Sequence, residues 1–412
     1  MKVLSISSFR KLEAAFLATT IALALSFLLD GCASPAAPPA PGGKGLSHVS
    51  EAERLAYIRE AEVWSPIDTA SLDLRRGPPG GIPLSAGGEL VCRFHVPSEQ
   101  PGGRSQKLYC RTSDGKVHKI KYGVDNKEIY GEAIGARLLW ALGFKADVVQ
   151  PVRVRCSGCP EDPWRYLERL RAWDDPPPVP DPAERVIEPA IVESYYAELI
   201  EAEKDQGVAW GEILELRSRD PEKAERQRIH REALTLLATL MQHADSKASN
   251  HTLGCAPGGA VTAADGRRVC EEPVIYIGDL GGAGGYGWVP FHEPSLKRLV
   301  SPSKVRFEEW EKVPVWSDPE ECITKVNGMP NATLGNEKIS EDGRRFLAER
   351  ISLLSDDQWV ALIELSRIEL LEEELETPDG ERRLVTPEDR IEVLKRKLRQ
   401  VLDHRCPPAS RE

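Results

Sequence analysis

The segment between residues 229 and 281 constrains the fold of this chain more than any other. Its first part carries apolar residues at helical spacing and predicts an amphipathic helix that ends just before His243. The apolar run Val274–Ile277 predicts a short buried strand leading into Asp279, and the glycines after it let the chain turn away. The predicted order is therefore helix, polar loop, hairpin, strand and turn. The apolar positions of the helix are Ile229, Ala233, Leu236, Leu237, Leu240 and Met241.

Polar residues in the loop and after the strand follow the spacing His-x-Asp-x-Lys-x-x-Asn and then Asp-x-Gly. Transfer of a phosphoryl group to a hydroxyl needs a carboxylate that accepts the hydroxyl proton, a cation near the moving group, and oxygen ligands for Mg²⁺. Asp245 and Lys247 are the candidate catalytic residues, and Asn250 and Asp279 are the candidate metal ligands. Each of them alone is more simply a polar loop or turn residue. The four together, in this order, favour phosphoryl transfer.

A lysine-bearing strand and the helix after it supply candidate partners for these residues. Three strand-like stretches predict an antiparallel meander, and alternation places Lys119 and Lys121 on one face of its third strand. The helix predicted through Leu142 carries Glu132 beside its apolar stripe. We expect Lys121 and Glu132 to form the ion pair that positions nucleotide phosphates, with Lys119 as the alternative lysine. The three stretches are 90–95, 107–111 and 117–122.

The turn between the first two of these stretches contains Gly102 and Gly103. A glycine turn at this place can lay backbone N–H groups over phosphates, so both residues are candidates for nucleotide binding. An ordinary hairpin loop is the alternative interpretation.

Residues 1–31 have the pattern of a bacterial lipoprotein signal peptide. Basic residues precede an apolar run, 14–29, which is short for a membrane span, and a small residue stands directly before Cys32. We expect cleavage there and acylation of Cys32, which would anchor the chain by lipid in the bacterial cell envelope, at the outer membrane. Residues 32–46 predict a Pro/Ala/Gly-rich tether. A transmembrane anchor and a cytosolic protein with an apolar N-terminus are the alternatives.

The net charge bears on the kind of partner. The chain has a formal charge of −11, and loss of the predicted signal peptide would remove three positive and two negative side chains, leaving it one unit more negative. So acidic a chain is poorly suited to a polyanion, and we expect no nucleic acid among its partners. We also expect a monomer.

The cysteines predict a disulfide framework. Nine are present, and eight remain once Cys32 is assigned to the lipid. An even number in an exported chain favours disulfides. A redox pair or half of a zinc site is the alternative for Cys156 and Cys159, although no second Cys-x-x-Cys is present. Proximity and elimination favour Cys92 with Cys110, Cys156 with Cys159, Cys255 with Cys270, and Cys322 with Cys406.

Changes in composition and pattern along the chain suggest its organisation into two lobes and a tail. Helices are expected around 191–204 and 208–216, within an insertion that the sequence does not otherwise explain. The expected divisions are 47–155 for an N-lobe with a preceding helix, 156–370 for a C-lobe with an insertion at 160–226, and 371–412 for a C-terminal helical tail.

Taken together, these residues resemble the atypical branch of the protein-kinase-like fold, the phosphatidylinositol 3/4-kinase-like and HipA-type group, and the chain also resembles a set of bacterial envelope lipoproteins. Lys121-Tyr122-Gly123-Val124-Asp125 is similar to the Lys-x-Gly-x-Asp stretch of lipid kinases, and Arg137–Phe144 fits the helix after it. His243–Asn250 is similar to the His-Arg-Asp loop of protein kinases, and Asp279-Leu280-Gly281 replaces Asp-Phe-Gly. The similarity covers roughly 88–290, lacks a full Gly-x-Gly-x-x-Gly loop and has a longer gap between the last two motifs.

The resemblance implies an α+β fold that is bilobal and protein-kinase-like, with a small antiparallel-sheet N-lobe containing one helix and a mainly helical C-lobe. It also implies a phosphotransferase that moves a phosphoryl group from ATP, with Mg²⁺ or Mn²⁺, to an unknown hydroxyl acceptor in a protein, lipid or small molecule. ATP would lie between the lobes with its phosphates on Lys121.

Alternatives to this function stay open, because the bacterial envelope is not expected to hold much ATP. The protein could act on a molecule outside the cell, use another phosphorylated donor, or be a catalytically inactive lipoprotein that binds a nucleotide or a partner. A metal site formed by His243, Asp245 and His251 is a further alternative.

Overall fold

The computed structural model describes residues 46–409 apart from 86–87, 99–100, 104, 171–177, 180, 195–197, 203–206, 286–306, 328–330 and 378. All of these belong to one compact unit, residues 36–412. The predicted signal peptide, Cys32 and all but the last residue of the tether lie outside the described residues. No described helix combines the length and the hydropathy needed to cross a membrane.

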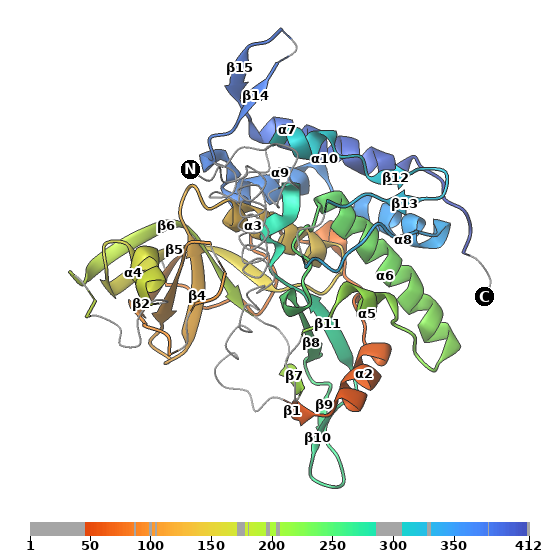
Figure 1. The fold of residues 1–412 in the computed structure, drawn as a ribbon, viewed down its shortest axis with the longest axis horizontal. Helices are drawn as coiled ribbons and strands as arrows, with labels where there is room; N and C mark the ends of the chain where they lie inside the picture. Colours follow the sequence, from red (N-terminus) through yellow and green to blue (C-terminus); the bar gives the residue numbers. More distant parts are fainter. Residues whose placement is uncertain are drawn as a thin grey trace, which may run out of the picture. The chain divides into compact units, whose positions relative to one another are not determined.

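The lysine-bearing strand β4 belongs to a closed barrel (Figure 1). The meander of β2, β3 and β4 is antiparallel, as the sequence predicts, and β6 pairs with both β4 and β5. The barrel closes because β5 runs parallel to β2. The expected small antiparallel sheet is therefore a barrel with one parallel pair. The strands are β2 (Glu89–Phe94), β3 (Lys107–Arg111), β4 (Val117–Tyr122), β5 (Val148–Cys159) and β6 (Ala183–Ser194).

Strand β6 contradicts the helix expected around 191–204. Residues Ala183–Ser194 form β6, and β7 follows at Glu198–Ala202. Within β6, Ala190 and Val192 pack in the barrel core, whereas Ile191 packs in the larger core on the other side of the strand. Because both faces are buried here, the sequence shows no polar–apolar alternation that would reveal a strand.

Helices outside the barrel build the larger core. Helix α3 (Lys127–Ala141) carries the predicted apolar stripe and packs against α9 and the 3₁₀ turn η3 (Leu280–Gly285). Helix α6 (Pro221–Met241) ends as the sequence predicts, because Gln242 adopts a left-handed conformation with φ 55°. The other helices are α2 (Glu51–Glu60), α4 (Pro163–Leu170), α5 (Trp210–Leu214), α7 (Phe307–Lys312), α8 (Glu341–Ile351), α9 (Asp356–Ser366) and α10 (Pro387–Leu402).

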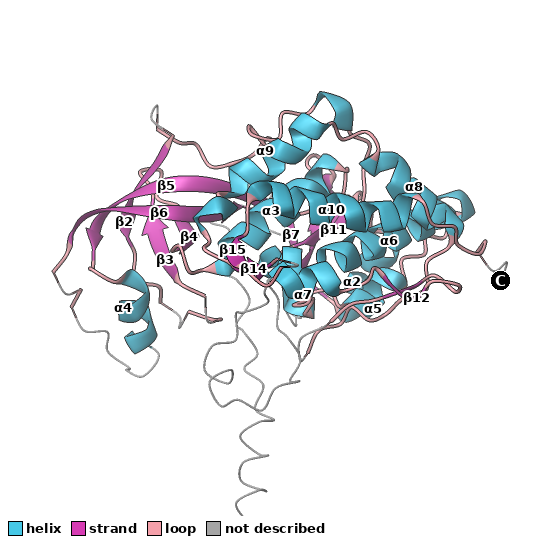
Figure 2. Ribbon diagram, turned by 90° about the horizontal axis from the view of Figure 1, so that it is seen from above, coloured by secondary structure: helices cyan, strands magenta, loops and turns pink. Residues whose placement is uncertain are grey.

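A second sheet carries the polar loop and the strand that leads to Asp279. Its order is β1–β7–β8–β11, with β11 antiparallel to β8. In Figures 1 and 2 the barrel strands lie apart from helices α6, α8 and α10. The fold is thus a mixed α+β arrangement. The remaining strands are β1 (Leu46–Val49), β8 (His251–Cys255), β9 (Ala260–Thr262), β10 (Arg268–Cys270), β11 (Pro273–Ile277), β12 (Trp316–Asp318), β13 (Ile323–Thr324), β14 (Glu374–Glu376) and β15 (Arg382–Leu384).

Disulfide bonds link the eight cysteines that follow Cys32. Two of them lie in the barrel, where the Cys110 and Cys156 sulfurs are 4.0 Å apart. Another closes the β9–β10 hairpin at its base, between β8 and β11. The bonds join the pairs that proximity favours: Cys92–Cys110, Cys156–Cys159, Cys255–Cys270 and Cys322–Cys406.

Candidate phosphotransfer site

Lys121 lies at the centre of a buried cluster of charges. Its side chain is only 3% exposed, and its ammonium pairs with Glu132 of α3 and lies 3.0 Å from Asp279 Oδ1. Glu193 Oε1 lies 3.3 Å away and Glu128 Oε2 lies 3.5 Å away. The structure therefore brings together Lys121, Glu132 and Asp279, which sequence reasoning groups from three separate elements.

The ionisation of this cluster depends on a balance between burial and charge. Burial alone would lower the pKa of Lys121, but Asp279 and Glu132 raise it well above its usual range. Burial alone would raise the pKa of Glu193, yet Lys119, 2.6 Å away, and Lys121 lower it to about 2. Burial also opposes ionisation of Asp279, whose pKa Lys121 nevertheless holds far below its usual range. For Glu132 burial prevails and raises the pKa.

Close packing joins the turn after Asp279 to helix α3. A Cβ atom on Gly281 would lie 2.8 Å from the Cβ and Cγ of Glu128 and 3.2 Å from Glu132 Oε1. Asp279 itself adopts a left-handed conformation, with φ 48°. The absence of a side chain at Gly281 thus lets one carboxylate oxygen from each of Glu128, Glu132 and Asp279 gather within 4.8 Å of the others.

Two buried histidines hold the loop that precedes β8. His251 Nδ1 lies 2.9 Å from the Val208 carbonyl oxygen, which can only accept, so Nδ1 carries the proton of the neutral ring. His251 Nε2 then accepts, and His243 Nε2, 3.2 Å away, donates. Burial lowers the pKa of His243 to about 3 and that of His251 to about 4. Both rings are therefore neutral at pH 7, and His243 anchors the loop.

The candidate catalytic residues lie on this anchored loop. The Lys247 ammonium is 2.9 Å from Asp245 Oδ1, and both side chains are partly exposed. Asn250 Nδ2 donates to the Asp245 backbone carbonyl at 2.6 Å, which fixes the conformation of the loop. Burial and the charge of Asp279 raise the pKa of Asp245, against the opposing effect of Lys247. A raised pKa makes Asp245 a better proton acceptor than an ordinary aspartate.

Strand register brings the loop and Asp279 together. In the β8–β11 pair, Ile277 lies opposite His251, so the residues just beyond the strand ends are neighbours. Gly278 N donates to the Asn250 carbonyl oxygen at 2.9 Å. The long sequence gap between Asn250 and Asp279 is thus taken up by the hairpin, and the two candidate metal ligands emerge at the same edge.

The glycine turn predicted to bind phosphates lies over a different lysine. Lys107 Nζ donates to the Gly102 carbonyl oxygen at 2.5 Å, and a Cβ on Gly103 would come within 2.9 Å of the same nitrogen. Lys107 is opposite Lys121 in the β3–β4 register. The turn is therefore connected to the Lys121 cluster through Lys107.

Sequence reasoning missed three residues of this arrangement. Glu128 stands one helical turn before Glu132, a spacing that places both on one face. Lys107 alternates with Leu108 at the start of β3, but a single lysine there gives no distinctive signal. Glu193 could not have been found, because its segment was expected to be helical.

Two sets of side chains among the described residues have a geometry suited to a metal ion. The first is the carboxylate set of Glu128, Glu132 and Asp279. The second is Cys322, His404 and Cys406, whose two sulfurs are already joined in a disulfide. The alternative metal site of His243, Asp245 and His251 is not among these sets, and the hydrogen bond between the two histidines occupies Nε2 of each ring.

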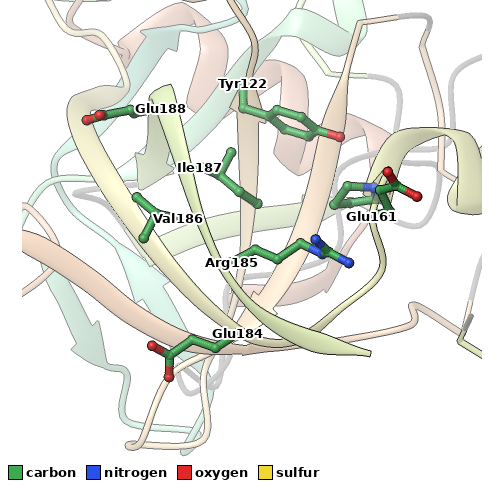
Figure 3. A pocket seen from close by; sticks show the side chains of 8 residues that line it. Tyr122, Glu161, Glu184, Arg185, Val186, Ile187 and Glu188 are labelled. Atoms are coloured by element: carbon green, nitrogen blue, oxygen red, sulfur yellow. The ribbon is translucent and has the colours of Figure 1, made fainter. Parts of the chain in front are cut away.

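A surface pocket of about 450 Å³ lies on the barrel (Figure 3). Its wall includes Tyr122, Arg185 and Ile187, from β4 and β6. The Tyr122 hydroxyl accepts a hydrogen bond from the Trp164 backbone at 2.9 Å. None of the candidate catalytic, nucleotide-binding or metal-binding residues lines the pocket, and we assign it no role in the chemistry.

No protein-family model matches this chain. A comparison with curated proteins also finds no match.

Similar backbones are found among solved structures, among them two bacterial proteins. One is the proinflammatory kinase CtkA of Helicobacter pylori, with 11% sequence identity and a TM-score of 0.37, over 76% of this chain and 96% of that one. The other is HipA of Shewanella oneidensis MR-1, in complex with HipB and operator DNA, with 10% identity and a TM-score of 0.29, over 75% of this chain and 65% of that one. With TM-scores this low, neither likeness assigns a role to any residue.

Proposed function

We propose that this chain is a kinase-like phosphotransferase that moves a phosphoryl group from a nucleotide to a hydroxyl acceptor. The observation that carries the proposal is the meeting of Lys121, Glu132 and Asp279 at the sheet edge where Asn250 ends the Asp245 loop. Three separate elements supply the cation, its positioning carboxylate and a metal-binding carboxylate. A fourth supplies a proton acceptor. Catalysis of phosphoryl transfer consists largely of such positioning.

Each residue has a definite task in the proposed reaction. Asp245 accepts the proton of the acceptor hydroxyl as the new O–P bond forms and the terminal P–O bond of the donor breaks. Lys247, beside Asp245, neutralises charge on the transferred phosphoryl group. Lys121 holds the donor phosphates, and Glu132 keeps its ammonium in place. His243 and His251 maintain the loop and exchange no proton, because both are neutral and buried.

The donor set fits a magnesium–nucleotide complex. Glu128, Glu132 and Asp279 offer oxygen ligands from one small volume, and oxygen is the ligand atom that Mg²⁺ prefers. Glu132 Oε2 is buried and has no hydrogen-bond partner among the described residues. When bound, Mg²⁺ would neutralise charge on the donor phosphates. Asp279 and the Asn250 side-chain oxygen would hold the ion, with Glu128 as a third ligand.

The envelope location is part of the proposal and depends on residues 1–46 alone. The short apolar run and Cys32 support lipid anchoring at the outer membrane. The acceptor would then be a hydroxyl compound of the envelope or of the exterior.

Nucleotide binding and label transfer by the purified full chain test the proposal. ATP labelled on its terminal phosphate is supplied with Mg²⁺ or Mn²⁺ and generic hydroxyl acceptors, and Asp245→Asn and Asp279→Asn are compared with wild type. Asp265→Asn is a matched control, because that aspartate lies in the exposed β9–β10 turn. We expect ATP to raise the melting temperature and label to reach an acceptor, with transfer lost in both site variants only.

Other outcomes of the same experiment would support an alternative function or exclude the proposed one. Stabilisation by ATP without transfer would indicate a catalytically inactive binding module. Neither stabilisation nor transfer by wild type would overturn the proposal.

A further inference from the structure

Lys107 is a buried cation beside Lys121 with a very different environment. The two residues are directly opposite each other on antiparallel strands, so their side chains leave the sheet on the same face. Lys107 is 5% exposed. Its ammonium donates to the Gly102 carbonyl oxygen and lies 5.4 Å from the centre of the Trp164 ring.

The two lysines differ in their counter-charges. Lys121 has four carboxylates within ion-pair distance. Lys107 forms an ion pair with no carboxylate among the described residues; its contacts there are a carbonyl oxygen and an aromatic face. A buried charge without a counter-ion is costly, so the site favours an anion that reaches the ammonium.

Hydrogen bonds from neighbouring elements position the backbone beside Lys107. Gly103 has φ +70°, a left-handed conformation that favours glycine, and the Lys107 ammonium lies 2.9 Å from where its Cβ would be. At the other end of the turn, the Gln106 carbonyl accepts from Tyr122 N at 3.2 Å and from Asn126 Nδ2 at 3.0 Å. Those bonds connect the start of β3 to the start of α3, so Lys107 is held in position before any ligand arrives.

We propose that Lys107 is a second phosphate-binding cation, which takes the outer phosphates of a nucleotide while Lys121 takes the inner part of the same polyphosphate. The description of the ligand as a nucleotide rests on the proposed function. The anion site itself rests on the buried ammonium that has no carboxylate partner among the described residues, the glycine turn and the register with Lys121. No covalent step is involved, because Lys107 binds and positions the donor.

The charge of Lys107 is responsive to such a ligand. Burial, together with Lys121 and Lys119 on β4, lowers its pKa to about 8, against the opposing charges of Glu128 on α3 and Asp279 after β11. A bound anion raises the pKa again, so binding above pH 8 takes up a proton. Affinity therefore falls as the pH rises from 8 towards 10.

Titration calorimetry of the full chain with ADP and with inorganic pyrophosphate at pH 7.5 tests the proposal. We expect Lys107→Met to weaken both about 10- to 100-fold, the size of a lost charge-assisted hydrogen bond. Lys116→Met removes an exposed lysine directly before the start of β4 and is the matched control, with unchanged affinity. Thermal unfolding checks that each variant is folded.

A second measurement needs only wild type. ADP binding at pH 8.5 is followed in two buffers of different ionisation enthalpy, and we expect net proton uptake. Zero uptake would overturn the role of Lys107 even if Lys107→Met failed to fold.

The outcomes separate this inference from the proposed function. If wild type binds ADP and Lys107→Met binds it equally well, the inference fails and the proposed function stands. If wild type binds pyrophosphate through Lys107 but does not bind ADP, the anion site stands and the nucleotide function fails. Binding of neither ligand overturns both.

Discussion

The two halves of the candidate site are held by opposite means. Around Lys121, buried acidic and basic side chains hold one another, and neighbouring charge displaces the pKa values of Lys121, Glu193 and Asp279. Around His243 and His251, neutral groups form a directed chain of hydrogen bonds that ends at a backbone carbonyl. A charged ligand entering the first half must exchange partners with Lys121, whereas the second half can stay unchanged. The charged groups around Lys121 would thus bind the ligand, whereas the neutral hydrogen bonds keep the conformation of the loop.

The largest expected effect separates turnover from binding. Asp245→Asn removes the proton acceptor on the loop that the two histidines hold and leaves Lys121 untouched, so we expect transfer to fall about 10³-fold with nucleotide affinity within about threefold of wild type. Lys121→Met should lose both transfer and binding. Single-turnover assays and calorimetry on the two variants measure this. If both variants lost binding equally, the two halves would not differ as we describe.

Removing one charged partner from the Lys121 cluster should lower the stability of the folded protein. Lys121→Met leaves Glu132 and Glu193 buried with less compensating charge, and we expect about 3–5 kcal/mol of destabilisation. The double variant Lys121→Met/Glu132→Leu should recover part of that loss. Urea unfolding at pH 7 gives the comparison, and Lys116→Met should produce no measurable change. A single variant as stable as wild type would contradict the ion-cluster description.

The neutral half should be sensitive to acid. The folded-state pKa values of His243 and His251, about 3 and about 4, lie below the ordinary value of 6.5. The unfolded chain therefore binds more protons below pH 6.5, and stability falls as the pH is lowered from 6.5 towards 4. The loss is roughly 3 kcal/mol for each histidine. Between pH 5 and 6, the unfolding free energy of His243→Gln should depend less steeply on pH than that of wild type. The two slopes should differ by up to about 1.4 kcal/mol per pH unit. An unchanged slope would mean that His243 is not buried as a neutral ring.

The smallest effect probes the place where the halves meet. Gly281→Ala would push the turn after Asp279 away from Glu128 and Glu132, and we expect about 1–3 kcal/mol of destabilisation with weaker nucleotide binding. Gly211→Ala is the control, because nothing lies within 4 Å of a Cβ at that exposed helical position. Melting curves with and without ATP measure both effects. Equal behaviour of the two alanine variants would show that the contact with α3 is not needed.

Local patterns were sufficient for part of this arrangement. The spacing of apolar residues predicted the end of α6 at Met241, and the meander placed Lys121 on β4. Glu132 could be singled out because it follows Lys121 on the next helix. In each case the signal lies within one element or between two consecutive ones.

Pairing between strands that are distant in the chain could not be predicted from the sequence. Residues 189–192 of β6 are buried on both faces by partners that are distant in the chain, so this part of the strand shows no alternation, and Glu193 beside it was not recognised. Lys107 is an ordinary strand residue until β4 places Lys121 opposite it. Barrel closure through the parallel β2–β5 pair likewise depends on contacts that no local pattern encodes.

The pairing of Ile277 with His251 has a consequence for how this site can vary. Since the residues on either side of the β8–β11 ends are fixed by register, the tip of the hairpin between them can lengthen or shorten freely without moving Asn250 or Asp279. Chains with the same site can therefore differ widely in the number of residues between the two motifs. Related proteins are better recognised by two buried strands, one directly after the loop that ends at Asn250 and one shortly before Asp279, than by a fixed number of residues between the two motifs.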